Sequence, residues 1–359
     1  MTKLAILAPA NVNHTHKWAH ALAARGYDVT VITQHAATEP YDPAITIKQL
    51  PHGGFKGYFL NRSALKRLIS AIDPDIIHVH FASGYGTLAA LSLKRPYLLS
   101  VWGSDVYEFP YRSALHKAWI RWSLKRATKI ASTSHDMAKQ VRGLIGDVPV
   151  DVTPFGVQLE NYAATRPAFS HNSLTIGTAK KLDHRYGIDI LIKSFADLYH
   201  GASPELQQQL QLRLVGDGPQ RAELEALTQQ LGISEQVTFV GVVPSYQVPA
   251  EINKMDIVVL SSRIESFGVS AIEALAAQRP TIATRVGGLP EIIMHEKTGL
   301  LVSSESTEQL TQAMQRFIAN TREAQQLAQA GFEYAHENFS MAATTDRMVE
   351  VLKTMNESS

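Results

Sequence analysis

Cysteine is absent from this chain of 359 residues, and so is any long apolar run. A helix that crosses a bilayer needs roughly 18 consecutive apolar residues, so any contact with a membrane is expected to be peripheral. The apolar stretch 4–10 is too short, and too weakly flanked by charge, to be a secretory leader. These absences predict a protein of the reducing cytoplasm, attached at most to the inner face of the cytoplasmic membrane.

The glycine pattern of a nicotinamide-binding domain is also missing. No Gly-x-Gly-x-x-Gly follows the first predicted strand, and Gly216 and Gly218 are followed by Pro219 without a third glycine. A nicotinamide dehydrogenase is therefore disfavoured, although it would contain the same kind of sheet.

Patterns that could hold a metal are few. Asp73 and Asp75 have the Asp-x-Asp spacing, but they precede a predicted strand and are expected in a solvated turn. Two His-x-His pairs occur, His14 with His16 and His78 with His80. Their side chains are expected to point to opposite faces, and no third ligand is evident. The sequence predicts neither a metal nor a cofactor.

The chain does contain 45% apolar residues, which exclude a disordered or fibrous protein. Short β-branched runs alternate with helical patterns, which predicts two α/β domains with parallel, doubly wound sheets. The expected strands are 3–8, 28–33, 75–80, 97–101 and 129–133, then 174–177, 211–216, 237–241, 257–260 and 281–284.

We expect domains at residues 1–165 and 166–335, divided by an aperiodic crossing around 154–173. A C-terminal helix at 336–359 is expected to pack back on the first domain. The net charge of +1 is uneven, because residues 1–165 contain 18 Lys and Arg against 11 Asp and Glu, and the remainder 16 against 22. The first half therefore prefers anionic partners more than the second does.

The strongest chemical pattern is RIESFGVSAIEAL at 263–275, in which Glu265 follows a predicted strand and Glu273 lies in the next helix. Four residues between them offer consecutive backbone N–H groups at a helix start, namely Ser266, Phe267, Gly268 and Val269. Such a start favours an anion like pyrophosphate. Glu273 could then accept hydrogen bonds from a ribose diol, and Glu265 from sugar hydroxyls. The alternative is a helix N-cap and an exposed helix residue.

Four further segments are LVGDGPQRAELEAL (214–227), VTFVG (237–241), TRVGGLPEII (284–293) and KTGLLV (297–302). With 263–275, they resemble in order and spacing the family-4 retaining glycosyltransferases over nearly the whole second half. The resemblance implies a GT-B fold, two Rossmann-like domains facing a cleft, with a nucleotide sugar held mainly by the second domain. It also implies transfer with retained anomeric configuration, and Gly216 is counted with the donor-binding residues.

In that family, a basic pair after the first strand of the second domain neutralises the donor diphosphate. Lys180 and Arg185 keep the spacing, although Lys and Arg are exchanged and Tyr186 stands before Gly187. Two fixed cations stabilise the charge that develops on a departing diphosphate and can replace a metal there. The alternatives are Lys181 in place of Lys180, or a solvated basic turn.

In the first half, VWGSDV (101–106) follows a predicted strand. Many members of the resembling family have His-Gly-x-Asp there, so Trp102 replaces a His that touches the donor sugar, and Asp105 is carried over as a residue that binds or positions a sugar. The alternative for Asp105 is a turn-forming helix cap. Three residues in the loop expected at 9–18 are candidates for the acceptor site, namely His14, His16 and Lys17.

A basic stripe is predicted on one helix, because four cations recur every four residues and no acidic residue lies between 111 and 129. Its members are Lys117, Arg121, Lys125 and Lys129. Leu115, Trp119 and Trp122 are expected to face another side. The stripe could meet an anionic membrane surface or a lipid-linked diphosphate, and the alternative is an ordinary solvated face.

These features predict a retaining, metal-independent hexosyl- or N-acetylhexosaminyltransferase that uses a nucleotide diphosphate-sugar, with UDP favoured by family habit. The predicted acceptor is a glycan, lipid-linked as in assembly of envelope polysaccharide, lipopolysaccharide O-antigen or capsule. No protein nucleophile stands beside a base. In the mechanism that the resemblance implies, a donor phosphate oxygen would take the acceptor's proton. A nucleotide-sugar epimerase of the same fold is the main alternative, and nucleic acid is not expected as a partner.

Overall fold

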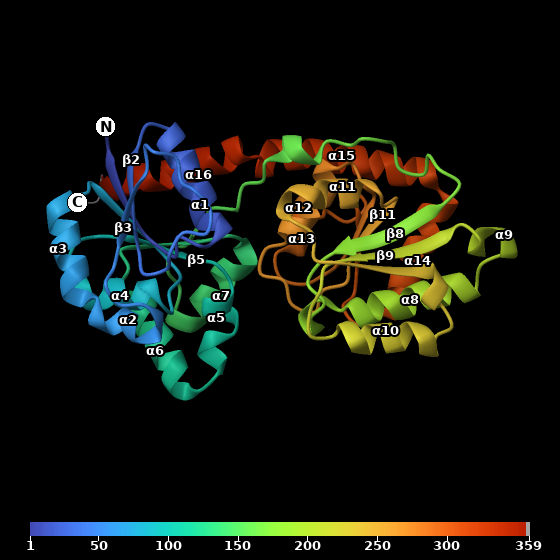
Figure 1. Cartoon of the computed structure of the whole chain (residues 1–359), viewed down its shortest axis with the longest axis horizontal. Helices are drawn as coiled ribbons and strands as arrows, with labels where there is room; N and C mark the ends of the chain where they lie inside the picture. The colour runs from blue at the N-terminus through green and yellow to red at the C-terminus, as the bar shows by residue number, and fades with distance from the viewer. Residues whose placement is uncertain (357–359) are drawn as a thin grey trace. The chain divides into compact units, whose positions relative to one another are not determined.

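Two parallel sheets, one of seven strands and one of six, organise the computed structural model, which describes residues 1–356 (Figure 1). Each sheet belongs to its own unit. The first contains Met1–Gly156 and the segment from Met341, and the second contains Val157–Ser340. The division lies nine residues before the expected boundary at 165, because Leu159–Tyr162 (η2) packs against helices of the second unit.

The sheet of the first unit has the order β3-β2-β1-β4-β5-β6-β7. Its strands are β1 (Lys3–Leu7), β2 (Asp28–Thr33), β3 (Thr46–Gln49), β4 (Ile76–His80), β5 (Leu98–Val101), β6 (Lys129–Ser132) and β7 (Asp151–Val152). β1, β4 and β5 are buried almost throughout, as their apolar and β-branched sequences require. The order reverses between β1 and β4, which is where open parallel sheets usually bind ligands.

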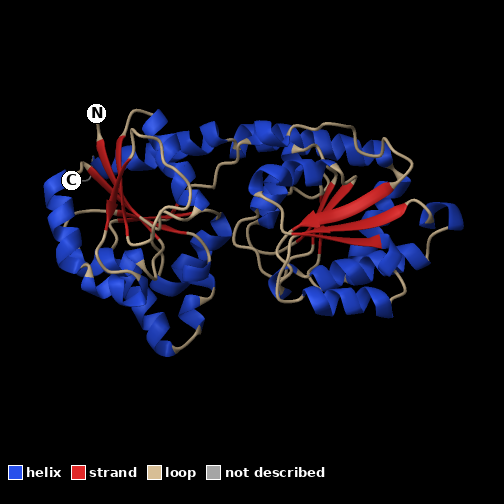
Figure 2. Cartoon of the chain, viewed as in Figure 1, coloured by secondary structure: helices blue, strands red, loops and turns tan. Residues whose placement is uncertain are grey.

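Helices cover both faces of this sheet (Figure 2). They are α1 (Asn13–Ala24), α2 (Gly54–Leu60), α3 (Arg62–Ile72), α4 (Tyr85–Ser92), α5 (Ser104–Tyr107), α6 (Ala114–Arg126), α7 (His135–Ile145) and α16 (Met341–Asn356). α16 packs against α1, and Arg25 pairs with Asp346 at 2.5 Å. The expected final helix, 336–359, is thus two helices, since α15 ends at Phe339; residues 357–359 lie outside the described chain.

The sheet of the second unit has the order β10-β9-β8-β11-β12-β13, with its reversal between β8 and β11. Its strands are β8 (Leu174–Ala179), β9 (Leu210–Val215), β10 (Val237–Gly241), β11 (Ile257–Leu260), β12 (Thr281–Thr284) and β13 (Leu300–Val302). Its helices are α8 (Ile188–His200), α9 (Pro204–Gln207), α10 (Arg221–Gln230), α11 (Val248–Asn253), α12 (Val269–Ala276), α13 (Leu289–Ile292), α14 (Thr307–Ala319) and α15 (Thr321–Phe339). The hydrophobic core between this sheet and its helices includes Ile176, Leu212 and Phe195.

The basic stripe is shorter than the sequence predicted. α6 ends at Arg126 because Ala127 has extended backbone angles, and Lys129 is the first residue of β6. The Nζ of Lys129 donates a 2.6 Å hydrogen bond to Oγ1 of Thr354 in α16. Lys129 is therefore not a member of the stripe. Among the described residues, no helix combines the length and the apolar character needed to cross a bilayer.

Candidate active site

The loops after β8, β11 and β12 meet at the carboxyl edge of the second sheet, around its reversal point. The carbonyl oxygen of Arg185 accepts hydrogen bonds from the backbone N–H groups of Arg263 (2.7 Å) and Ile264 (3.1 Å). The carbonyl oxygen of Glu265 accepts one from Gly288 (3.2 Å). The loops that carry the predicted donor residues are therefore joined through their backbones at the usual ligand position of such a sheet.

Two glycines allow these loops to approach so closely. Gly216 has a φ of +128°, and a Cβ there would overlap the carbonyl oxygen of Lys180. Gly287 has a φ of +51°, and a Cβ there would overlap the carbonyl oxygen of Glu265. Both positions need glycine for conformation and for space. Gly216 thus acts by fixing the backbone of a candidate diphosphate ligand.

Lys180 follows β8 directly, and its Nζ donates a 2.6 Å hydrogen bond to Oε2 of Glu265. The two side chains are only 11% and 10% exposed. The ammonium lies 4.7 Å from the centre of the Tyr186 ring, and the guanidinium of Arg185 lies 5.8 Å from the same centre. The ring holds both cations by cation–π contact, while Lys181 is exposed. The geometry favours Lys180 over Lys181.

Arg185 also binds Asp183, with its Nε 3.0 Å from Oδ1 and its Nη2 3.3 Å from Oδ2. The hydrogen bonds and charge of this guanidinium lower the pKa of the Asp183 carboxyl. Two cations thus stand beside two carboxylates, which limits how far either cation side chain can swing away.

The start of α12 provides the backbone of the predicted anion site. Gly268 is its N-cap, with a φ of +113°, and Val269 is its first residue. Phe267 is 3% exposed, and its ring packs 6.0 Å from that of Phe339. The Phe267 side chain therefore belongs to the packed interior, and Ser266 precedes it in the same turn. The positive end of the helix dipole lies here.

Glu273 lies one turn further along α12, and its Oε1 accepts a 2.6 Å hydrogen bond from the hydroxyl of Tyr162. Burial, followed by the neighbouring Glu273, raises the pKa of Tyr162. The phenol therefore stays protonated and donates. Its donation holds Oε1 of the Glu273 carboxylate in place.

Arg263 anchors the segment between the two glutamates. Its guanidinium donates to both oxygens of Asp189 in α8, at 2.7 and 2.9 Å, and it also binds Glu305. The Arg263 and Asp189 side chains are 14% and 17% exposed. Bidentate pairs of this kind fix orientation as well as supplying energy. The RIESFG turn is therefore tied to the helix that follows the cation loop.

In the first unit, Asp105 is 1% exposed. Its Oδ2 accepts from the N–H of Ala82 at 2.9 Å, and its Oδ1 accepts from the N–H groups of Trp102 (3.2 Å) and Gly103 (2.9 Å). Burial raises the pKa of Asp105, and the backbone hydrogen bonds oppose that shift. This geometry favours the turn-forming alternative, in which Asp105 holds the loops after β4 and β5 together.

The three acceptor-site candidates expected in the loop after β1 lie instead at the start of α1, because that helix already begins at Asn13. His14 stacks on Phe155 with ring centres 3.7 Å apart, and it meets the edge of Trp102 at 5.8 Å. Burial, and then the charge of Lys17, lowers the pKa of His14 to about 4. His16 instead bonds the carbonyl oxygen of Pro40 at 2.9 Å, so the two histidines have different surroundings.

The expectation that His78 and His80 point apart is wrong. Side chains two residues apart in a strand share a face, and Nε2 of His80 lies 3.4 Å from Nδ1 of His78. Nε2 of His78 lies 2.7 Å from Oγ of Ser100, and the His80 and Trp102 rings are 4.4 Å apart. Burial lowers the pKa of His78 to about 3 and that of His80 well below its usual value. These are neutral core histidines.

Metal ligands do not gather in the part of the chain that the structure describes, where no group of three His, Asp or Glu side chains could hold an ion. Asp73 ends α3 and pairs with Arg95 at 2.9 Å, and Asp75 accepts from the N–H of Lys3 at 2.8 Å. The Asp-x-Asp pattern thus belongs to a turn.

Two tyrosines of the site were missed by sequence reasoning. Tyr186 was noted only as an interruption before Gly187, whereas its ring gathers Lys180 and Arg185. Tyr162 lies 111 residues from Glu273, and no local pattern marks it as a partner.

Two sequence models of protein families match the chain. The one described as glycosyl transferases group 1 matches residues 165–334, and the one described as glycosyl transferase 4-like matches residues 3–134. A 2-deoxystreptamine glucosyltransferase of Streptomyces kanamyceticus is 25% identical, over 74% of each chain. D-inositol 3-phosphate glycosyltransferase 1 of Catenulispora acidiphila is 26% identical, over 94% of this chain and 89% of its own.

Solved structures share the fold. Sucrose-phosphate synthase from Thermosynechococcus elongatus has a TM-score of 0.84 at 22% identity, covering 100% of both chains. Anabaena HepE in complex with UDP has a TM-score of 0.81 at 17% identity, covering 99% of this chain and 100% of that one. Nothing in these comparisons supports the epimerase alternative.

Proposed function

Since this chain belongs to the group 1 glycosyltransferases and has the GT-B fold, we propose that it moves a hexosyl or N-acetylhexosaminyl group from a UDP-sugar to a lipid-linked glycan in envelope polysaccharide assembly. Transfer retains the anomeric configuration and needs no metal. One observation carries the proposal: Lys180, Arg185 and Glu265 gather around the Tyr186 loop, next to the start of α12.

The diphosphate lies between the two cations and the first N–H groups of α12. Charge grows on the departing diphosphate, and both the cations and the helix dipole stabilise it. Fixed cations supply the stabilisation that a metal ion supplies in other transferases. Lys180 and Arg185 are held by carboxylates and by one aromatic ring, so little reorganisation is needed as the charge develops.

Glu273 binds the ribose hydroxyls, and Glu265 binds a hydroxyl of the transferred sugar. Both are acceptors whose orientation is fixed, by Tyr162 and by Lys180 respectively. Neither acts as a nucleophile, because a retained configuration follows when the acceptor hydroxyl enters on the face that the phosphate leaves. UDP is favoured by the likeness to HepE, whose structure contains UDP.

The first unit supplies the acceptor side. His14, His16 and Lys17 open α1 at the carboxyl end of β1, and Trp102 lies beside His14. Asp105 positions the Trp102 loop through its backbone hydrogen bonds. A lipid-linked acceptor is supported by the cations Lys117, Arg121 and Lys125, which are exposed on α6 and suit a diphosphate or an anionic membrane surface.

The test is a panel of UDP-, GDP- and ADP-sugars incubated with the protein in EDTA, with and without glycan acceptors. We expect release of UDP that depends on the acceptor. We also expect NMR to show the same anomeric configuration in the product as in the donor sugar. Glu273→Gln should lower kcat/KM by about 100-fold, whereas the exposed Glu337→Gln on α15 should not. Release abolished by EDTA and restored by Mg²⁺, or a product of inverted configuration, would contradict the proposal.

A further inference from the structure

Large apolar side chains are exposed together on the first unit. Ten such residues are exposed in the described chain, and six of them come from α2, η1 (Phe109–Tyr111) and α6. They are Phe55 (63% exposed), Phe59 (39%), Leu60 (58%), Tyr111 (62%), Leu115 (82%) and Trp122 (39%). We call these six the apolar patch. Exposed apolar residues are ordinary when scattered, but a contiguous group marks an interaction surface.

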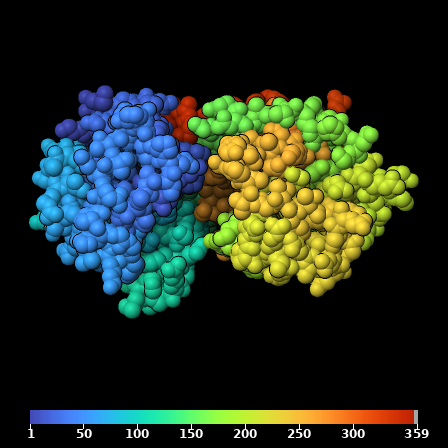
Figure 3. Space-filling model, viewed as in Figure 1, coloured from blue at the N-terminus to red at the C-terminus, as the bar shows by residue number. Residues whose placement is uncertain are grey.

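Ring contacts join the three elements of the patch, α2, η1 and α6. Phe55 and Phe59 lie 5.9 and 5.6 Å from the ring of Trp119, and Phe109 lies 5.4 Å from it. The indole N–H of Trp119 donates a 2.7 Å hydrogen bond to Thr87. The hydrogen bond fixes the Trp119 ring, and the exposed rings of Phe55 and Phe59 pack against it. Figure 3 shows the chain of α6 at the lower end of the first unit.

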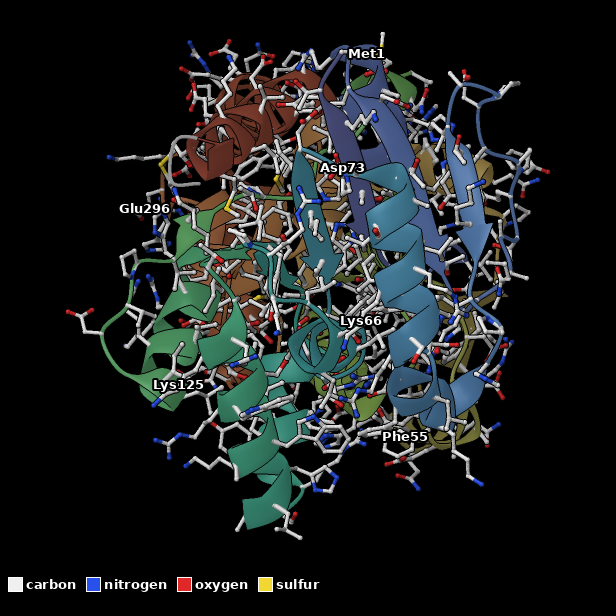
Figure 4. All side chains as sticks on the ribbon, turned by 90° about the vertical axis from the view of Figure 1, so that its left-hand side faces the viewer. Met1, Phe55, Lys66, Asp73, Lys125 and Glu296 are labelled. Carbon is white, nitrogen blue, oxygen red and sulfur yellow. The ribbon has the colours of Figure 1, made fainter. Side chains whose placement is uncertain are left out.

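The segments that carry the patch are rich in cations. Residues 43–72 and 109–135 contain no acidic residue. Ten Lys and Arg side chains of these segments are exposed, and none has an ion pair within the described chain: Lys48, Lys56, Arg62, Lys66, Arg67, Arg112, Lys117, Arg121, Lys125 and Arg126. Figure 4 faces this side of the unit and labels Phe55, Lys66 and Lys125.

We infer that the apolar patch and its cations bind the surface of an anionic phospholipid membrane. Aromatic and leucine side chains enter the boundary between headgroups and acyl chains, and Lys and Arg contact the headgroup phosphates. Nucleic acid would also attract the cations, but it offers no apolar phase for Leu60 and Leu115, which are 58% and 82% exposed. The combination therefore favours lipid.

This inference rests on the proposed function only for its biological role, since a lipid-linked acceptor would be bound at the membrane. The inferred surface also differs from the basic stripe that the sequence predicted. The inferred membrane-binding surface excludes Lys129, which lies in β6, and includes α2. Apolar side chains lie beside the cations on this surface. Attachment then needs two signals, apolar insertion and charge, as reversible membrane binding generally does.

The experiment is flotation of the full chain with vesicles of phosphatidylcholine alone or with 30% phosphatidylglycerol, at several salt concentrations. We expect binding only to the anionic vesicles, weakening as salt rises. Lys117→Glu with Lys125→Glu should lower partitioning by about 30-fold or more, since each cation is worth about fivefold at the surface and the new carboxylates are repelled by it. The matched control, Lys297→Glu with Lys353→Glu, changes net charge equally on other exposed segments and should bind like the wild type.

The apolar signal is tested separately. Phe55→Ser with Leu115→Ser should abolish flotation, whereas Val242→Ser with Tyr246→Ser, exposed residues of the second unit, should not. Trp122 emission should shift to the blue on anionic vesicles and be quenched by brominated acyl chains, with Trp122→Phe removing the signal. Equal binding to neutral vesicles, flotation that survives both patch variants, or binding only to a DNA or RNA homopolymer would overturn the inference.

Failure of the inference and of the proposed function can be told apart. UDP release with a soluble acceptor should be unchanged in the Phe55→Ser, Leu115→Ser variant, because neither residue is in the donor site. Vesicle binding without any sugar transfer would refute the function alone, and transfer without vesicle binding would refute the inference alone.

Discussion

The hydroxyl of Tyr162 lies 2.6 Å from Oε1 of Glu273, although 111 residues separate them in the chain. Tyr162 ends η2, the turn by which the chain enters the second unit, and Glu273 lies on the helix whose start faces the candidate diphosphate site. The hydrogen bond orients the Glu273 carboxylate within the protein itself, without any ligand. Tyr162 is therefore a positioning residue for the proposed ribose ligand.

Replacing Tyr162 by Phe should weaken donor binding. Loss of one hydrogen bond to a charged group costs about 1.5 kcal/mol, or about tenfold in the KM for the UDP-sugar, while kcat should change little. Steady-state kinetics with varied donor measure this directly. Tyr334→Phe, which removes a hydroxyl on α15 that donates to the carbonyl of Glu291, is the matched control. An unchanged donor KM, or a fall in kcat alone, would argue against the positioning role.

The Lys180–Glu265 pair should matter for both stability and catalysis. Because both side chains are nearly buried, removing one partner leaves an uncompensated charge, which costs about 3–5 kcal/mol. Glu265→Gln should therefore lower the unfolding midpoint of the second unit as well as kcat. The double variant Lys180→Met, Glu265→Leu should recover stability but not activity. If it recovers both, the pair is structural and the proposed site is elsewhere.

The sequence predicted the central strands of each sheet well and the edge strands unevenly, since β10 was predicted at 237–241 and the other edge strands were not. β8, β11 and β12 carry apolar, β-branched runs with turn residues on both sides, and all three were found. β3, β7 and β13 were missed. β3 is exposed on most residues, and β7 and β13 have only two and three residues, which is too short for a hydrophobic period to be recognised.

The site divides in the same way. Glu265 and Glu273 could be proposed because a single continuous motif contains them, and Lys180 and Arg185 because they keep the spacing of a basic pair in the family that the sequence resembles. The contacts made by Tyr162 and Tyr186 depend on how distant loops come together, and a linear pattern contains no such information. Whether an aspartate like Asp105 faces a ligand or its own backbone is likewise decided by loop geometry.

Glycine replacement offers a test of the loop packing. Gly287→Ala should destabilise the second unit by about 3 kcal/mol or more, because the residue has a positive φ and its new Cβ would overlap the carbonyl oxygen of Glu265. Gly143→Ala is the control, since Gly143 lies inside α7 with open space around it. It should stabilise the first unit by about 0.5–1 kcal/mol. Urea unfolding measures both, and a tolerated Gly287→Ala would contradict the packing described.

The first unit should lose stability as the pH falls below about 6.5. His14, His78 and His80 are buried as neutral rings, with pKa values of about 4 for His14, about 3 for His78 and a lowered one for His80. Below pH 6.5 these histidines bind protons in the unfolded chain but not in the folded unit. The free energy of unfolding therefore falls as the pH falls from 6.5 toward those values. Each group then contributes a loss of about 1.4 kcal/mol per pH unit. Asp105, whose pKa is raised by burial, opposes the loss at the acid end.

Tryptophan emission reports this unit alone, because all four tryptophans, Trp18, Trp102, Trp119 and Trp122, lie in it. Between pH 7 and pH 5, the unfolding free energy in urea should fall by about 2 kcal/mol for each of His14 and His78, and the lowered pKa of His80 should add to the fall. His78→Gln should lower stability at pH 7 but reduce the pH-dependent fall by about 2 kcal/mol, whereas the exposed His171→Gln of the second unit should leave the profile unchanged. A flat profile in the wild type would mean that these histidines are charged in the folded unit, and the stacked, desolvated arrangement around Trp102 would then be wrong.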